Sequence, residues 1–346
     1  MELGYLLNSN SKFSSYSSKF YEILVANQVP FRLIDPNSIT LLDELKQCSH
    51  LLFKHSMGDT DRILYEAIFH IAHNVYGVKC FPNYETFWPN ENKIREYYLL
   101  KSNGFPIIDS AVFWNYQKAD EFLQNAQFPI VAKLPKGASS ENVILVSSYK
   151  EGKKVIRQVF NQGVRRRGFK TRSSLSALSK VGLKKYGKDL LKSHLVDLGW
   201  MRDKNEYAVW QIQKDAILFQ KFLPDNKFDT RITVIGNRAF AFRRFVRKND
   251  FRASGSGNLD MNPQEIDPRC VRLAFDIAKK MNFNTMAYDF IYDQNKQPHI
   301  SEISYGFVYY FLERCPGYWD DELNWVPGHF SPQKCQLQDF LGIELK

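Results

Sequence analysis

The chain has 346 residues, of which 44% are hydrophobic, and its formal net charge is +10. This length exceeds what one hydrophobic core usually serves, so we expect two or three subdomains. Neither a basic leader before an apolar run nor an apolar stretch of membrane-spanning length is present, which predicts a soluble cytoplasmic protein. The five cysteines lack CxxC spacing and are odd in number, which argues against a disulfide framework or a zinc site.

The first 88 residues alternate short apolar runs with helix-like stretches. The runs lie at 3–7, 31–34, 50–53 and 78–81, and the helix-like stretches at 17–27 and 61–75. This rhythm is typical of a small α/β sheet.

The middle of the chain begins with a helix at residues 90–104, marked by its polar start and its terminal glycine. A strand pattern follows at 105–112. Residues 128–133 predict a buried strand that ends in Lys133, and a small-residue loop at 135–142 leads into a strand at 143–147. This arrangement differs from a P-loop, which would need GxxxxGK[ST] running into a helix.

Residues 150–192 form a basic insert with fourteen Lys or Arg residues and two acids. Its apolar spacing favours short amphipathic helices with basic outer faces. Such a surface could bind an anionic polymer or a lipid-linked substrate, or it could simply be a solvated helical face. Regular aromatic interleaving is missing, so a nucleic acid is a poor candidate partner.

The last third of the chain predicts a strand at 217–224, a hairpin of strands 229–235 and 238–246, and a helix at 270–281. A second hairpin follows and carries two carboxylates, Asp289 and Glu302. If its turn centres on Asn295 and Lys296, the two acids are direct partners on one face. Like charges this close repel unless a cation lies between them.

Hard oxygen ligands without a nearby His or Cys suit Mg²⁺, which often uses one or two carboxylates together with substrate phosphates. Asp289 and Glu302 therefore favour a metal and nucleotide site. The alternative is a solvated hairpin with two unrelated surface acids.

The order of several features resembles the ATP-grasp superfamily, especially its carboxylate-amine ligases, such as ribosomal-protein glutamate ligases, glutathione synthetases and D-alanine ligases. The series comprises Lys93, Lys133, the loop 136–143, residues 220–224, 229–231 and 250–252, Asp289 and Glu302. The resemblance implies an ATP-grasp fold of the α/β (α+β) class. Its expected parts are an N-terminal α/β pre-ATP-grasp domain (1–88), a lid subdomain holding the basic insert (89–215) and a C-terminal subdomain (216–346).

The resemblance also implies that the chain binds ATP and Mg²⁺. The cofactor-binding residues would be Lys93 and Lys133 on the phosphates, Gly137, Ala138, Ser139 and Ser140 in the lid loop, Gln220, Lys221, Phe222 and Leu223 at the adenine hinge, and Asp229 near the ribose or a main-chain group. Other interpretations remain open: Lys93 as a solvated surface lysine, the loop as an ordinary turn, and Gln220 as part of a plain buried strand. Asn142 stands where many relatives carry a second glycine.

Asp289 and Glu302 match the metal ligands of the superfamily. The usual third ligand is Asn, and here it is Ser304, so either Ser304 or a water molecule would fill that position. Arg231 and Arg252 are candidates to bind the transferring phosphate and the developing oxyanion, and Arg243, Arg244 and Arg247 compete for that role.

The implied activity is ATP-dependent ligation of a carboxylate to an amine through an acyl phosphate. Residues 250–257 and 302–307, with the aromatic tail at 315–320 and 324–330, show a weaker likeness to ATP-grasp proteins of bacterial surface-polysaccharide synthesis, which suggests a sugar acid. The aromatic tail could equally cap the core. The rival functions are an ATP-grasp-type small-molecule kinase and a non-catalytic protein that binds polyanions.

Overall fold

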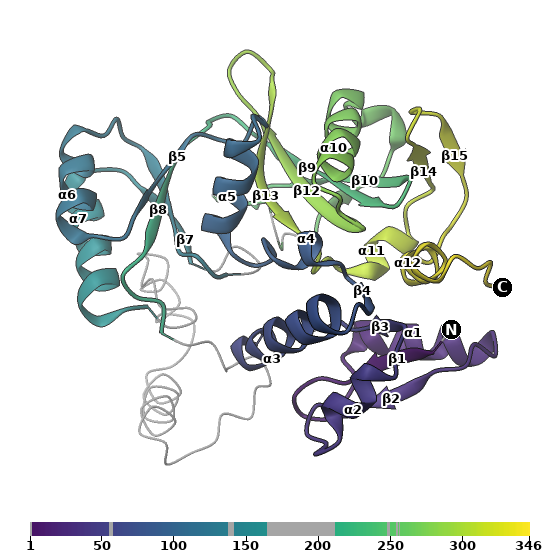
Figure 1. The fold of residues 1–346 in the computed structure, drawn as a ribbon. Coiled ribbons are helices and arrows are strands. Elements are labelled where there is room, and N and C mark those ends of the chain that lie inside the picture. The colour runs from purple at the N-terminus through teal and green to yellow at the C-terminus, as the bar shows by residue number, and fades with distance from the viewer. Residues whose placement is uncertain are drawn as a thin grey trace, which may run out of the picture. The chain divides into compact units, whose positions relative to one another are not determined.

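The computed structural model describes residues 2–54, 58–137, 142–164, 212–247, 250–253, 255 and 257–346 (Figure 1). By the packing of its backbone the chain forms two compact units. The large unit combines Met1–Asp109 with Leu223–Lys346, and the small unit is Ser110–Phe222. The finer three-part division expected from the sequence stays a prediction.

The large unit contains a parallel four-stranded sheet near its N-terminus. The strands are β1 (Leu3–Leu6), β2 (Arg32–Ile34), β3 (His50–Leu52) and β4 (Lys79–Phe81), in the order β2-β1-β3-β4. The helices between them are α1 (Ser15–Ala26), α2 (Leu41–Lys46) and α3 (Asp59–Phe69), the last continuing as a π-helical turn, His70–Val75. The small α/β sheet predicted for this region is confirmed.

A seven-stranded sheet forms the rest of the large unit. Its strands are β9 (Phe228–Ile235), β10 (Arg238–Phe245), β11 (Leu259–Asp260), β12 (Thr285–Tyr292), β13 (Pro298–Ser304), β14 (Gly317–Asp320) and β15 (Trp325–Pro327). Their order is β13-β12-β9-β10-β14-β15, with β11 paired to β10. The β9–β10 hairpin turns at Gly236 and Asn237, as the sequence predicts.

Helices cover both faces of this sheet. On one face α10 (Pro268–Lys280) and α5 (Lys93–Ser102) pack over residues such as Ile232 and Tyr288. On the other face α11 (Tyr309–Glu313) and α12 (Pro332–Leu341) cover Ile235 and Phe240. Because side chains alternate along a strand, Asp289 lies on the second face, the one covered by α11 and α12. A short helix, α4 (Tyr84–Phe87), precedes α5.

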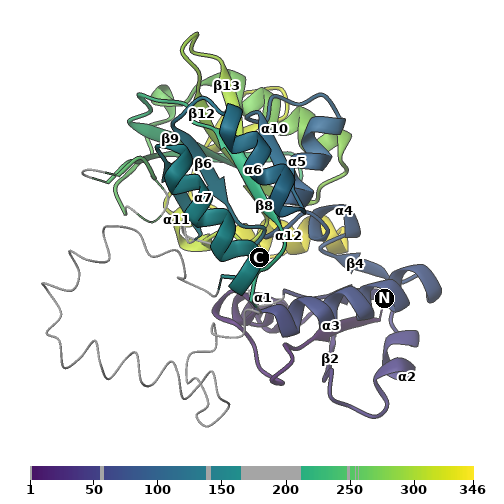
Figure 2. The same ribbon diagram turned by 90° about the vertical axis from the view of Figure 1, so that its left-hand side faces the viewer.

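The small unit is an antiparallel sheet with two covering helices. The strands β5 (Ser110–Phe113), β6 (Ile130–Lys133), β7 (Val143–Val146) and β8 (Ile217–Lys221) run in the order β5-β8-β6-β7. Figure 2 shows α6 (Tyr116–Asn125) and α7 (Tyr149–Arg157) side by side over this sheet. Their apolar faces meet around Leu123, Ile156 and Phe219. The start of the basic insert is thus an amphipathic helix, as predicted, and residues 165–192 lie outside the described ranges.

The aromatic tail packs onto the large sheet. Strand β14 pairs with β10, and β15 pairs with β14. The Trp319 and Trp325 ring centroids are 4.5 Å apart, and those of Tyr318 and Phe330 are 4.8 Å apart. This packing favours the interpretation of the tail as a cap on the core.

All five cysteines are buried, and none of them forms a disulfide with another. In the ranges that the structure describes, no helix combines the length and the apolar character that crossing a membrane would need.

Candidate active site

The β12–β13 hairpin places its two acids opposite each other. Asp289 pairs with Glu302, as the sequence predicts. The predicted turn is wrong, however, because Lys296 adopts a left-handed conformation (φ +59°) and the pairs nearest the tip are offset by one residue. A β-bulge next to Asp289 cancels that offset and restores the pairing of the acids.

Two guanidinium groups neutralise Asp289. Arg231, its partner on β9, donates from Nε and Nη2 to the two carboxylate oxygens at 2.6 and 2.7 Å. Arg244 of β10 approaches the same carboxylate at 2.6 Å. Burial disfavours the charged form of Asp289, which is 3% exposed, but the two arginines outweigh it and hold its pKa well below the usual range.

Arg244 also binds Asp229, with Nε and Nη2 at 2.7 and 2.6 Å from its carboxylate oxygens. Both side chains are buried. Burial raises the pKa of Asp229, and the nearby charge of Asp289 adds to that rise. Asp229, Arg231, Arg244 and Asp289 therefore form a group of two carboxylates and two guanidinium groups, of which Arg231 alone is partly exposed. We call this group the Asp-Arg cluster. The expected role of Asp229 near the ribose stays a prediction.

Glu302 is held by the first residue of α5. Asn92 caps this helix, and the Lys93 Nζ lies 2.9 Å from Glu302 Oε1. Lys93 is only 4% exposed, so it is not the solvated surface lysine that the sequence left open. Burial opposes its charged form, but the carboxylates of Glu302, Glu96 and Glu91 outweigh that effect and raise the pKa of Lys93.

Two of these acids were missed by sequence reasoning. The Ser304 hydroxyl lies 3.3 Å from both Asn90 Oδ1 and Glu91 Oε1. Glu96 accepts a hydrogen bond from the Ile303 backbone N–H at 3.2 Å, and burial raises its pKa to about 8. The polar start of the helix at residues 90–104 was the signal for them, but it also fits an ordinary helix cap.

The oxygen atoms at this hairpin fit magnesium by their chemistry. Asp289 and Glu302 carry hard carboxylate oxygens on adjacent strands. Both oxygens of Asp289 accept from arginines, and Glu302, which Lys93 contacts, keeps 30% of its side chain exposed. No three His, Cys, Asp or Glu side chains in the described ranges form a metal-binding group of their own. Mg²⁺ does not require one, since it commonly takes one or two carboxylates and completes its shell with water and phosphate.

The structure brings Arg231 and Arg244 together on Asp289, whereas Arg243 and Arg252 have other partners. Arg231 belongs to the Asp-Arg cluster. Arg243 points to the opposite face, where it pairs with Asp260 and with Glu265 at 2.7 Å. Arg252 follows β10 in the chain and binds the Asp250 carboxylate, from Nε at 2.9 Å and Nη2 at 2.7 Å. We therefore leave Arg243 out of the proposed site.

The other candidate residues for ATP binding lie mainly in the small unit. Lys133 ends β6 and is 7% exposed, and Gln220 on β8 is 6% exposed, with its Nε2 donating to Ser110 Oγ at 3.4 Å. Gly137 is buried and Lys221 is exposed. Phe222 ends the small unit and Leu223 begins the large one. Ala138, Ser139 and Ser140 lie outside the described residues, and the ATP contacts of this whole set stay predictions.

Asn142, at the end of the lid loop, adopts a left-handed backbone conformation with φ +60°. Its backbone oxygen accepts from the Leu134 N–H at 3.2 Å, and its Nδ2 donates to Lys136 O at 3.3 Å. Asparagine tolerates this conformation better than most residues other than glycine. The position thus keeps the geometry that a glycine would supply.

We expect Asn142→Ala to destabilise the small unit by about 1–2 kcal/mol, because alanine is strained at positive φ, whereas Asn142→Gly should stay close to the wild type. Thermal unfolding of the two variants measures the difference. Equal stability of the alanine and glycine variants would contradict the backbone argument.

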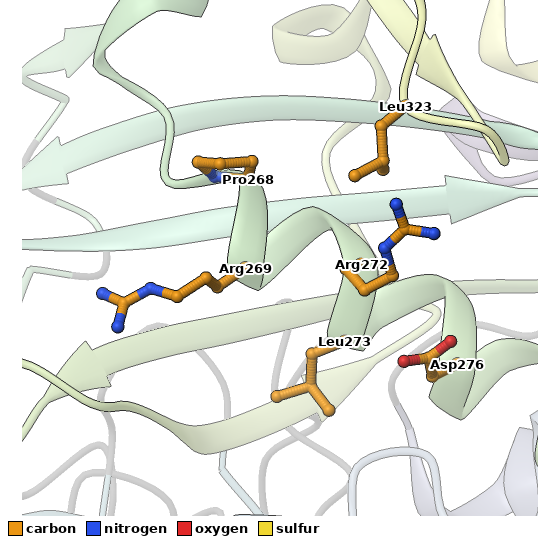
Figure 3. Close-up of a pocket in the computed structure, with 6 residues that line it drawn as sticks. All are labelled: Pro268, Arg269, Arg272, Leu273, Asp276 and Leu323. Carbon is orange, nitrogen blue, oxygen red and sulfur yellow. The ribbon is translucent and has the colours of Figure 1, made fainter.

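A shallow pocket of about 330 Å³ lies on α10, as Figure 3 shows. It is lined by Pro268, Arg269, Arg272, Leu273, Asp276 and Leu323. Helix α10 covers the face of the sheet opposite Asp289, so this pocket is separate from the paired acids, although its Arg269 donates to the Lys296 backbone oxygen at the tip of the same hairpin at 2.9 Å.

Comparison with solved structures defines the fold. The chain is similar to the ATP-grasp ligase PsnB complexed with minimal precursor (TM-score 0.57, 11% identity, 98% of each chain covered). It is also similar to N5-carboxyaminoimidazole ribonucleotide synthetase from Thermotoga maritima (0.57, 11%, 100% of this chain and 77% of that one) and to D-cycloserine synthetase DcsG (0.56, 12%, 98% and 100%). The chain has the ATP-grasp fold, which confirms the resemblance noted in the sequence.

The match to a protein-family model covers a shorter part of the chain than the structural similarity does. Residues 198–306 match the family described as the RimK-like ATP-grasp domain. This segment includes β9, β10 and the acidic hairpin, and therefore the whole Asp-Arg cluster. No curated protein matches the chain by sequence.

Proposed function

We propose that the protein is an ATP-dependent carboxylate-amine ligase. The observation that carries the proposal is the pairing of Asp289 with Glu302 beside Arg231, Arg244 and Lys93, on a hairpin within the RimK-like ATP-grasp segment. Two acids that could hold a metal, next to several fixed cations, are what binding and transfer of a phosphoryl group require.

The proposed reaction has two steps. A substrate carboxylate attacks the γ-phosphorus of ATP and yields an acyl phosphate and ADP, and an amine then attacks the acyl carbon and releases inorganic phosphate. Catalysis would rest on positioning and charge neutralisation, so no side-chain nucleophile is needed. When bound, magnesium would neutralise charge on the β- and γ-phosphates.

The residues divide this work between them. Asp289 and Glu302 would hold the metal, with Ser304 or a water molecule as a further ligand. Arg231 and Arg252 would stabilise negative charge on the transferring phosphate and the tetrahedral intermediate. ATP would be bound by Lys133, by the lid-loop residues 137–140 and by the hinge residues 220–223. The position of Lys133 at the end of β6, in the strand before the lid loop, supports this assignment.

The nature of the acid and the amine follows less directly. The aromatic tail packs on the core, so it lends no support to a sugar acid, and we propose ligation without restricting the acid to saccharides. We also propose a cytoplasmic location, because the reaction consumes ATP. An anionic polymer or a lipid-linked substrate at the basic insert remains a proposal for residues 150–192.

The test is a panel of acids and amines incubated with the purified protein, Mg²⁺ and ATP, with ADP, phosphate and product mass measured together. The proposal predicts ADP release that needs the acid, an acyl phosphate that hydroxylamine traps, and a product equal to acid plus amine minus water. A phosphorylated alcohol without a trappable acyl phosphate would show a kinase instead. Polyanion binding without any ADP release would favour the non-catalytic alternative.

A further inference from the structure

A lysine that the proposed reaction does not use is buried at the carboxyl edge of the parallel sheet. Lys54 follows β3 by two residues and is 7% exposed. In the strand order β2-β1-β3-β4, the chain adds β2 on one side of β1 and then β3 and β4 on the other side. The order of the strands therefore reverses between β1 and β3, although all strands are parallel. Open parallel sheets bind ligands at such a reversal, beyond the carboxyl ends of the strands.

In the part of the chain that the structure describes, the Lys54 ammonium has few polar contacts. Its Nζ donates to the Tyr305 backbone oxygen at 3.1 Å and lies 3.7 Å from the centroid of the Tyr305 ring. The Tyr16 ring is 5.0 Å away. An ammonium has three donors, and within the described ranges Tyr305 O is the one hydrogen-bond acceptor that Lys54 contacts.

The charged form of Lys54 is only partly compensated by its described neighbours. Burial lowers the pKa of Lys54 to about 7, and the Glu91 carboxylate opposes that shift only in part. A buried ammonium is costly unless a partner neutralises it. A bound carboxylate would supply both the missing charge and acceptors for the remaining donors.

Lys54 also lies next to the acidic hairpin. Its acceptor, Tyr305, directly follows Ser304 in the chain, and consecutive Cα atoms are about 3.8 Å apart. Glu91, whose charge reaches Lys54, is 3.3 Å from the Ser304 hydroxyl. An anion on Lys54 would therefore lie beside the proposed metal ligands.

We propose that Lys54 binds the carboxylate of the acid substrate and that the rings of Tyr305 and Tyr16 line the binding site. The inference rests on the proposed ligase function. It gives the N-terminal sheet a direct part in selecting the acid.

Lys79 provides a matched control. Its Nζ donates to the Phe340 backbone oxygen at 2.8 Å and lies 5.4 Å from the Phe340 ring centroid. The local contacts are thus of the same kind as those of Lys54. Lys79 is exposed, however, and it begins β4, so it lies at the amino edge of the same sheet.

The test is trace acetylation of the full chain with acetic anhydride at pH 8, with the labelling of each lysine read by peptide mass. Propionate and glutarate serve as carboxylate probes, inorganic phosphate as a second oxyanion, and chloride as an ionic-strength control. The proposal predicts several-fold slower labelling of Lys54 with either carboxylate, no such effect of chloride, and unchanged labelling of Lys79.

Three outcomes would overturn the proposal. Either carboxylates do not slow the labelling of Lys54, or phosphate alone slows it, or Lys54 is not labelled under any condition. Binding of Mg²⁺-ADP, measured by calorimetry on the same sample, separates this outcome from failure of the ligase proposal, which would abolish nucleotide binding itself.

A pair of variants gives a second readout. Once a substrate acid is found, Lys54→Met should raise its KM at least several-fold and leave the KM for ATP unchanged, whereas Lys79→Met should change neither. An unchanged KM for the acid in Lys54→Met would refute the assignment.

Discussion

The Glu302→Gln variant is expected to lose magnesium-dependent ADP formation by about 100-fold or more, since even residues that only support a metal ligand cost 10–100-fold when mutated. Glutamine keeps the shape of the side chain but removes the negative charge that would face the metal. Lys93, the partner of Glu302, keeps Glu91 and Glu96 nearby as further carboxyl groups, so the fold should survive. The rate of ADP release in a coupled assay measures the effect.

Glu265→Gln is the control for this experiment. Glu265 is a half-exposed acid that pairs with Arg243 on the opposite face of the same sheet. Its replacement should leave ADP formation unchanged. If Glu302→Gln retained wild-type activity while its unfolding midpoint was unaltered, the hairpin acids would have no part in the reaction.

Arg244→Met is expected to be the most destabilising single change, by about 3–5 kcal/mol, because it leaves buried carboxylates without their shared partner. Arg244 is 6% exposed and binds both Asp229 and Asp289. Methionine fills a similar volume, so the loss would reflect charge and hydrogen bonding more than a cavity. The free energy of unfolding in urea is the quantity to measure.

Arg243→Met tests whether burial is the cause. Arg243 lies on the neighbouring position of the same strand and also pairs with two acids, Asp260 and Glu265, but these are 25% and 50% exposed. Ion pairs open to solvent contribute about 1 kcal/mol or less. Equal losses of stability in the two variants would contradict the distinction between a buried and a partly exposed group.

Local patterns were enough to predict most of the fold. The helix at residues 90–104 has both its cap and its terminal glycine, and Gly104 adopts φ +77°. The pairing of Asp289 with Glu302 was also predicted, but from a turn that does not form. A bulge corrects the offset, and a bulge leaves no reliable mark in an alternating sequence.

The neutralisation of the acids could not be predicted in the same way. The sequence argument placed a metal between Asp289 and Glu302, whereas the structure supplies Arg231 from β9 and Lys93 from α5. The register of β12 against β9 depends on strands some 58 residues apart, and no turn fixes it. Such long-range pairing is a property of tertiary packing.

The sequence signal that pointed to Lys133, a lysine at the end of an apolar strand, also applies to Lys54. Lys133 ends an apolar strand and was predicted to bind phosphate, and Lys54 directly follows the apolar run at residues 50–53. Both lysines prove to be buried, at 7% exposed. The resemblance to the ATP-grasp superfamily includes Lys133, whereas no motif includes Lys54.

Binding of a non-hydrolysable ATP analogue, measured by calorimetry with and without Mg²⁺, tests the central claim most directly. The account predicts saturable binding of one nucleotide per chain that weakens sharply when EDTA removes the metal, and that Glu302→Gln no longer shows this dependence. Absence of nucleotide binding, or affinity that is the same with and without magnesium, would contradict it.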